Sequence, residues 1–256
     1  MRIFLTIVAL AFALLYLVGC WYLHAHQREL IYFGWATQAP IEGTDYALRR
    51  PDAILRGWVV NPDKPDPILY FGGNAESVEK NRDAFARLFP ARSVYLVAYR
   101  GYGASDGAPS LEKIVPDALA IFDDVQRRHP GQRIAVFGRS LGTGVASQLA
   151  AQRPIEKLAL VTPFDSMVAT GQSHYPIFPV SWLLDERYES DRALTRFDKP
   201  VLIVRAGRDD VVPPANTLHL IAALPKPPQV VLIEQADHND ILGHAECEAA
   251  LATFLR

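Results

Sequence analysis

Short apolar runs alternate with longer helical patterns through the last three quarters of the chain. Runs of about five residues between helical stretches of about 10–18 residues are typical of βαβ units around a parallel sheet buried on both faces. The predicted strands are Ile68–Phe71, Ser93–Tyr99, Arg133–Phe137, Lys157–Val161, Val201–Arg205 and Gln229–Ile233. The predicted helices are Ala75–Phe89, Leu111–Arg128, Gly142–Gln152, Pro214–Ala223 and Ile241–Leu255. With right-handed crossovers, this order predicts an α/β fold with a doubly wound, mostly parallel sheet.

Two segments depart from this alternation. Near the start, Glu29–Trp35, Thr44–Arg49 and Ile54–Val60 predict short strands, the last two paired, at an antiparallel edge of the sheet. Later, about 40 residues, roughly 162–200, separate two predicted strands, which is too long for a plain connection. This segment is rich in aromatic residues and prolines. We therefore expect it to form a small cap over the C-terminal edge of the sheet, where ligands bind in open α/β folds.

The N-terminal segment differs from the rest of the chain because Ile3–Leu23 carries no charged residue. At about 1.5 Å per residue, such a stretch spans a hydrocarbon core of roughly 30 Å. The stretch has Trp21 and Tyr22 near its end, and aromatic residues of this kind are common where a membrane helix reaches the membrane–water interface. We predict a single-pass membrane anchor over residues 1–24, followed by one folded domain over residues 25–256.

Two alternatives to an intact anchor remain open. Leu17-Val18-Gly19-Cys20 resembles the lipobox of bacterial lipoproteins, in which the cysteine, here Cys20, is acylated and becomes the new N-terminus. A cleaved signal peptide is the second alternative, although the apolar stretch is long for one. The anchor, the lipoprotein and the cleaved signal peptide all predict a protein located at a membrane or beyond it.

Composition excludes several classes of protein. Half of the 256 residues are hydrophobic, and 26 Lys and Arg residues stand against 28 Asp and Glu residues without a long run of one sign. Because a phosphate backbone binds a basic face, we expect no nucleic-acid partner. The only cysteines, Cys20 and Cys247, are too few for a disulfide framework or a thiolate metal site.

The pattern Gly-x-Ser-x-Gly occurs twice, at Ser105 and at Ser140. Ser140 follows a predicted apolar strand directly and opens a helix of small residues, which is the context of a nucleophile elbow. Ser105 is separated from its strand by five residues, beginning with Arg100-Gly101-Tyr102-Gly103, and is followed by Pro109, so no helix can begin there at once. The sequence therefore predicts Ser140 as the nucleophile and a loop position for Ser105.

A serine nucleophile needs a base, and the base needs an acid that holds it in one tautomer. In one known arrangement the order along the chain is Ser, acid, His. Among the histidines beyond the cap, His219 and His244 fall within predicted helices, whereas His238 lies in a loop just after a strand. Asp209 and Asp210 both follow the preceding strand, and we favour Asp209 because it stands at the strand-end position.

The chain carries a set of ordered motifs with these residues. They are Phe71-Gly72-Gly73-Asn74-Ala75, Tyr99-Arg100-Gly101-Tyr102-Gly103, Gly138–Gly142, Pro163-Phe164, Asp209–Pro213 and His238-Asn239-Asp240. Together they resemble the α/β-hydrolase superfamily. More narrowly, they resemble its membrane-anchored serine hydrolases of the serine-aminopeptidase-like branch, which also contains eukaryotic protein depalmitoylases. The resemblance runs from about residue 30 to the C-terminus.

The resemblance also implies an oxyanion hole. In the family, the loop after the first central strand reads His-Gly-Asn-Ala and supplies a backbone N–H. Here Gly72 replaces the histidine, while Gly73 and Asn74 match, so the backbone donor carries over to Asn74. The second donor is the N–H of Leu141, immediately after the nucleophile. The implied reaction is acyl transfer from Ser140 to water, and it calls for no metal or organic cofactor.

Three classes of function compete. An esterase or thioesterase acting on a small-molecule or lipid-like acyl substrate is favoured, because an aromatic cap and a membrane anchor both suit an amphiphilic substrate. A serine aminopeptidase or other peptidase could use the same triad, with Asp165, Asp185 or Glu186 gripping a free amine. A non-catalytic binding protein on a hydrolase fold is the third reading, although no triad member is missing.

Overall fold

The computed structural model describes residues 1–256 and contains one eight-stranded sheet. The strands are β1 (Tyr46–Arg50), β2 (Ala53–Val60), β3 (Ile68–Phe71), β4 (Val94–Val97), β5 (Ala135–Arg139), β6 (Leu158–Val161), β7 (Val201–Ala206) and β8 (Gln229–Ile233). Their order across the sheet is β1-β2-β4-β3-β5-β6-β7-β8. The pairs β1–β2 and β2–β4 are antiparallel and all the others are parallel. The doubly wound, mostly parallel sheet predicted from the sequence is confirmed.

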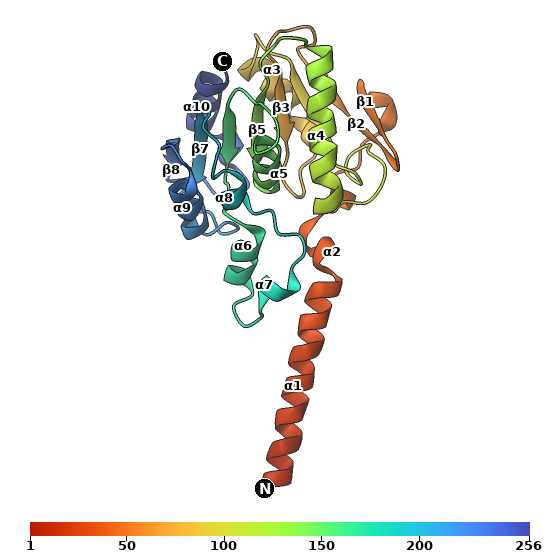
Figure 1. The fold of residues 1–256 in the computed structure, drawn as a ribbon, viewed down its shortest axis with the longest axis vertical. Coiled ribbons are helices and arrows are strands. Elements are labelled where there is room, and N and C mark those ends of the chain that lie inside the picture. Colours follow the sequence, from red (N-terminus) through yellow and green to blue (C-terminus); the bar gives the residue numbers. More distant parts are fainter.

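Helices cover both faces of this sheet (Figure 1). They are α3 (Arg82–Leu88), α4 (Leu111–Arg128), α5 (Leu141–Ala150), α9 (Pro214–Ala223) and α10 (Ala245–Leu255). On one face α4 packs against α5, and on the other α3 packs against α10. Because β3, β4, β5 and β6 are covered on both sides, every residue in these strands except Arg139 is buried. This double burial is the reason their sequences are apolar runs rather than alternating patterns.

The predicted cap contains three short helices, α6 (Met167–His174), α7 (Val180–Leu183) and α8 (Ser190–Ala193). Helices α6 and α7 pack against each other and project below the sheet on the side from which α1 (Arg2–Ala25) extends (Figure 1). Helix α8 packs against α5, so the C-terminal part of the cap contacts a helix that covers the sheet.

Helix α1 is long and apolar enough to cross a membrane by length and composition. It extends away from the domain, and none of its residues is buried within the protein (Figure 1). Its helical conformation continues without a break through Cys20. The division into an anchor over residues 1–24 and a domain over residues 25–256 stays a prediction.

One predicted strand is wrong. The segment Glu29–Trp35 forms the end of helix α2 (Gln27–Ile31) and a turn of 3-10 helix at Gly34–Ala36. It contributes nothing to the sheet because it follows α1 after a single turn residue and packs beneath the cap. There the Tyr32 hydroxyl donates a 2.5 Å hydrogen bond to Glu186 and lies 2.9 Å from the Tyr188 hydroxyl. The predicted pairing of the next two strands is confirmed by the antiparallel register of β1 and β2.

Candidate active site

Ser140 lies between the end of β5 and the start of α5, with φ 50° and ψ −119°. Side-chain-bearing residues rarely adopt this conformation, and it persists where the surroundings enforce it. The flanking glycines allow the turn to pack tightly. A Cβ on Gly142 would lie 1.9 Å from the carbonyl oxygen of Phe71, and one on Gly138 would lie 2.4 Å from that of Gly142. This is the geometry of a nucleophile elbow.

The side chains of Ser140, His238 and Asp209 form one hydrogen-bonded line at the carboxyl ends of β5, β8 and β7. Nε2 of His238 lies 2.8 Å from Oγ of Ser140, and Nδ1 lies 2.9 Å from both carboxylate oxygens of Asp209. The backbone N–H groups of Val211 and Val212 donate to Oδ1 of Asp209 and fix its orientation. The arrangement allows His238 to take a proton from Ser140 while Asp209 holds the imidazole ring.

The other residues considered for these roles lie elsewhere. Asp210 is exposed to solvent and is not bonded to His238. His219 is bonded through Nδ1 to Asp165 at 2.8 Å, and this hydrogen bond raises the pKa of the imidazole. His244 pairs with Asp240 at 3.1 Å.

Ser105 takes part in local loop structure. Its hydroxyl donates to the carbonyl oxygen of Ala98 at 2.8 Å and accepts the backbone N–H of Arg56 at 2.8 Å. It therefore joins the loop after β4 to strand β2. The second Gly-x-Ser-x-Gly match is a structural turn, as its sequence context indicates.

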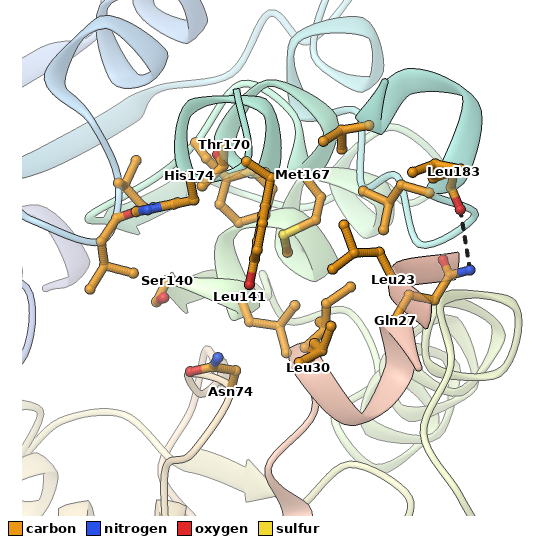
Figure 2. A pocket seen from close by; sticks show the side chains of 18 residues that line it. Leu23, Gln27, Leu30, Asn74, Ser140, Leu141, Met167, Thr170, His174 and Leu183 are labelled. Carbon is orange, nitrogen blue, oxygen red and sulfur yellow. Dashed lines mark hydrogen bonds between the residues drawn. The ribbon is translucent and has the colours of Figure 1, made fainter. Parts of the chain in front are cut away.

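The two predicted oxyanion donors face the same space as Ser140, since Asn74 and Leu141 line a pocket with it (Figure 2). The backbone N–H of Leu141 starts α5 and, like that of Asn74, has no acceptor within the protein. The neighbouring N–H of Gly73 is already bonded to Glu76 at 2.8 Å. The geometry thus leaves Asn74, rather than Gly73, with a free donor in this loop.

A buried ion pair connects the loops of the site, and the sequence did not indicate it. Arg139, inside the elbow motif, pairs with Glu76 at 2.9 Å, and the two side chains are only 12% and 11% exposed. Arg139 also donates to the backbone carbonyl groups of His238 and Asn239. Burial opposes the positive charge, but the nearby Glu76 carboxylate holds the pKa of Arg139 above its usual value. Since Glu76 accepts the backbone N–H of Gly73, the pair connects the loop of Gly73 and Asn74, the turn at Ser140 and the loop of His238.

The pocket above Ser140 has a volume of about 510 Å³, and no Asp, Glu, Lys or Arg side chain lines it. Most of its wall is aliphatic or aromatic, and the cap supplies Phe164, Met167, Tyr175, Val180, Leu183 and Leu184. The opposite wall comes from α1 and α2, through Leu23, Gln27 and Leu30 (Figure 2). Ile31 also lines the pocket. The sequence analysis did not foresee this second wall.

The acidic residues considered for gripping a free amine do not line the pocket. Asp165 is buried and bonded to Asn216 and His219. Glu186 is buried against Arg28, and Asp185 is 73% exposed on the outside of the cap. No cluster of three or more His, Cys, Asp or Glu residues is arranged to hold a metal ion.

Sequence and structure comparisons agree with this fold. Over 236 residues the chain is 34% identical to the uncharacterized protein Rv2307c of Mycobacterium tuberculosis, covering 86% of this chain and 83% of that protein. Among solved structures, it resembles the ferulic-acid-bound Est1E of Butyrivibrio proteoclasticus with a TM-score of 0.67 and 19% identity, over 82% of this chain and 98% of that chain. The chain belongs to the α/β-hydrolase superfamily.

Two further similarities narrow the comparison. The family described as "Serine aminopeptidase, S33" matches residues 66–174. Lysophosphatidylserine lipase ABHD12 of Danio rerio is 32% identical over 169 residues, which are 57% of this chain and 44% of that protein. Both similarities support hydrolase activity in this chain.

Proposed function

We propose that this protein is a serine hydrolase that cleaves an acyl ester or thioester. The observation that carries the proposal is the hydrogen-bonded line from Asp209 through His238 to Ser140, next to a pocket that no Asp, Glu, Lys or Arg side chain lines. The similarity to a lysophosphatidylserine lipase supports the same class of reaction. An uncharged, largely apolar wall favours an acyl chain over an ionic substrate.

The proposed reaction has two acyl-transfer steps. His238 takes the proton of Ser140 as its oxygen attacks the acyl carbon, and the N–H groups of Asn74 and Leu141 stabilise the oxyanion. His238 then gives the proton to the leaving alcohol or thiol, which departs and leaves the acyl group on Ser140. Water, deprotonated by His238, attacks this acyl-enzyme and releases the acid and free Ser140.

Activity-based labelling tests the proposal directly. We expect a fluorophosphonate to modify Ser140, detected as an adduct on its peptide by mass spectrometry. The Ser140→Ala protein should lose labelling and ester turnover, whereas Ser105→Ala should keep most of both. Normal turnover by Ser140→Ala would contradict the proposed nucleophile.

A serine aminopeptidase is the second candidate, and the family match over residues 66–174 favours it. Its weakness is that none of Asp165, Asp185 and Glu186 lines the pocket. A panel of p-nitrophenyl esters, thioesters and aminoacyl anilides distinguishes the two activities. Cleavage of the anilides alone would replace the esterase proposal, and failure of Ser140 to react with fluorophosphonate would support a non-catalytic binding protein.

We also propose that α1 is a retained single-pass membrane anchor. Its length and uncharged composition support this localisation. Carbonate washing should leave the full-length protein in the membrane. Metabolic labelling of Cys20 with a palmitate analogue, together with loss of the first nineteen residues, would instead support a lipoprotein.

A further inference from the structure

The tip of the cap, Tyr175–Trp182, exposes large apolar side chains. Ile177 is 71% exposed and Trp182 is 86% exposed, and neither lines the pocket. From Ser166 to Leu184 the sequence has no Asp, Glu, Lys or Arg residue. An uncharged surface with exposed aromatic and aliphatic side chains is typical of a site that contacts a membrane or another protein.

This cap tip lies alongside α1 rather than apart from it. The rings of Tyr16 and Phe178 are stacked with centroids 5.5 Å apart, and the Tyr16 hydroxyl donates to the carbonyl oxygen of Ile177 at 3.0 Å. Further along the helix, Nδ1 of His24 lies 2.7 Å from the carbonyl oxygen of Leu183. The cap therefore follows α1 from its C-terminal end back to Tyr16.

The length of α1 indicates whether the contact between Tyr16 and the cap lies inside or outside a bilayer. A hydrocarbon core of roughly 30 Å needs about 20 helical residues at about 1.5 Å each. Helix α1 has 24 residues, Arg2–Ala25, and its uncharged part is bounded by Arg2, so that 14 residues from Arg2 to Leu15 separate Tyr16 from the N-terminal limit of this uncharged part. These 14 residues span about 21 Å, which is too short to cross the core. If α1 crosses a bilayer, Tyr16 and the cap residues packed against it lie within that bilayer.

Beyond the contact between α1 and the cap tip, toward the domain, the first Asp, Glu or Arg residues after α1 and after the cap tip lie next to each other. Gln27 donates to the Asp185 carboxylate at 3.1 Å, and Arg28 pairs with Glu186 at 2.9 Å. Below them, α1 and the cap tip contain no Asp, Glu, Lys or Arg residue as far as Arg2. This step from charged to uncharged surface is what a lipid headgroup boundary would require of both elements.

The pocket lies between these same two elements. Figure 2 shows Leu23 and Leu30 on one side, Met167 and Leu183 on the other, and Ser140 at the inner end. The apolar wall thus continues from the uncharged part of α1 toward the elbow. An acyl chain that followed this wall would pass from lipid to pocket without crossing water.

We infer that the cap tip is embedded in the lipid leaflet beside α1, and that the pocket takes the acyl chain of a bilayer lipid directly from that leaflet. This inference rests on the proposed acyl-ester hydrolase function and on the proposed membrane anchor, and it adds the source of the substrate and the surface that contacts the lipid. The partner is a lipid bilayer, since the exposed residues of the tip are continuous with the membrane-crossing part of α1.

Fluorescence quenching locates the cap tip in full-length protein reconstituted in phosphatidylcholine vesicles. An environment-sensitive dye is attached to Ile177→Cys in a Cys20→Ser background. Cys247 is fully buried, and burial raises the pKa of its thiol to about 12, so it does not compete for the dye. The matched control is Gln126→Cys, exposed in the last turn of α4, at the end of the domain far from α1 (Figure 1).

We expect lipids with a nitroxide on the upper acyl chain to quench the dye at residue 177 more strongly than lipids with a headgroup nitroxide. Aqueous iodide should quench it weakly. The dye at residue 126 should respond in the opposite way. Equal iodide quenching at both positions, with no effect of the acyl-chain nitroxide, would overturn the inference.

A charged tip tests substrate entry in the same vesicles. We expect Ile177→Asp/Trp182→Asp to lower kcat/KM for a long-chain acyl ester in the bilayer by about tenfold or more, while p-nitrophenyl butyrate turnover stays within about twofold of wild type. The control Ile177→Leu/Trp182→Phe should keep both activities. Full activity of the charged variant on the bilayer ester would overturn the inference.

Failure of the proposed function gives a different result. In that case wild-type Ser140 would fail to react with fluorophosphonate and butyrate would not be cleaved, whatever the tip contacts. If the charged variant lost both activities through misfolding, the dye at Ile177→Cys would still report whether the tip lies in lipid.

Discussion

Two adjacent aspartates follow β7, and only Asp209 is bonded to His238. Its carboxylate is 6% exposed and accepts two backbone N–H groups, whereas Asp210 faces solvent. We expect Asp209→Asn to lower kcat by about 10³-fold or more, because the amide no longer holds the imidazole in the required tautomer. Asp210→Asn should change kcat on p-nitrophenyl butyrate by less than about twofold. A larger loss from Asp210→Asn would reverse the assignment.

Arg139, next to Ser140, reaches two other loops of the site, one through Glu76 and one through the carbonyl groups of His238 and Asn239. We expect Arg139→Leu to lower kcat by at least about tenfold and the free energy of unfolding by about 3 kcal/mol, since the buried Glu76 carboxylate loses its positive partner and keeps only its hydrogen bonds from Tyr70, Gly73 and Asn81. Urea unfolding and ester kinetics measure the two effects. The control is Arg133→Leu, which removes a side chain that is 70% exposed in its ion pairs and should change neither quantity appreciably. Unchanged kcat in Arg139→Leu would limit the pair to a stabilising role.

For single residues, the sequence allowed predictions about side chains in the loops that follow strands. It gave no indication of ion pairs between residues far apart in the chain. Ser140, Asp209 and His238 could be proposed from the sequence because each lies in the turn or loop that follows a predicted strand, and the ends of parallel strands meet at one edge of the sheet. Glu76 and Arg139 are 63 positions apart. Nothing local to either residue indicates that their side chains meet.

Among the elements, the sheet and most of its helices were predictable because their burial depends on period and length. The predicted helix Ala75–Phe89 is an exception, because only Arg82–Leu88 is α-helical, after a 3-10 turn at Val78–Asn81. Helix Leu111–Arg128 has the bounds expected from its amphipathic pattern. The segment after α1 was misread, because an apolar stretch of five or six residues is compatible with a strand or a helical turn. Within the cap, the sequence indicated apolar content but not orientation. Of its aromatic residues, Phe164 and Tyr175 line the pocket, while Trp182 lies outside it.

The pocket walls predict a chain-length preference. Burying apolar surface contributes about 0.8 kcal/mol per methylene, so each two-carbon extension should raise kcat/KM by up to about tenfold until the pocket is full. Met167→Trp should shorten the preferred chain because it fills part of the cavity. Leu218→Trp, at an exposed position on α9, should leave the preference unchanged. A series of p-nitrophenyl esters measures this, and best cleavage of acetate with a steady fall toward octanoate would contradict the acyl-chain pocket.

In the whole molecule, the predicted anchor and the predicted domain share the pocket. Leu23 belongs to α1, yet it lines the space above Ser140. Helix α1 also packs closely against the cap, since a Cβ on Gly19 would lie 3.0 Å from the Phe178 ring. The sequence could not predict it, because a helix that is apolar on every side shows no preference between lipid and cap. Topology alone brings residues 16–24 beside residues 177–183.

Deleting residues 1–24 separates anchoring from catalysis. The hydrophobic core begins at Tyr32 and includes no residue of α1, so we expect the truncated protein to fold and Ser140 to react with fluorophosphonate at the full-length rate. Turnover of p-nitrophenyl butyrate should stay within about threefold of the full-length protein in detergent. The advantage of octanoate over butyrate should shrink, because Leu23 and the contacts that hold the cap against α1 are lost.

Deleting residues 1–14 is the matched control for this truncation. It keeps Tyr16, Gly19, Leu23 and His24, and therefore the contacts of α1 with the cap and the pocket. In detergent, this variant should keep the full-length preference for octanoate, although the remaining apolar helix is too short to cross a bilayer. If both truncations kept the preference, the cap alone would define the pocket. If the longer truncation lost butyrate turnover and fluorophosphonate labelling as well, α1 would be required for the active fold rather than for the acyl-chain wall.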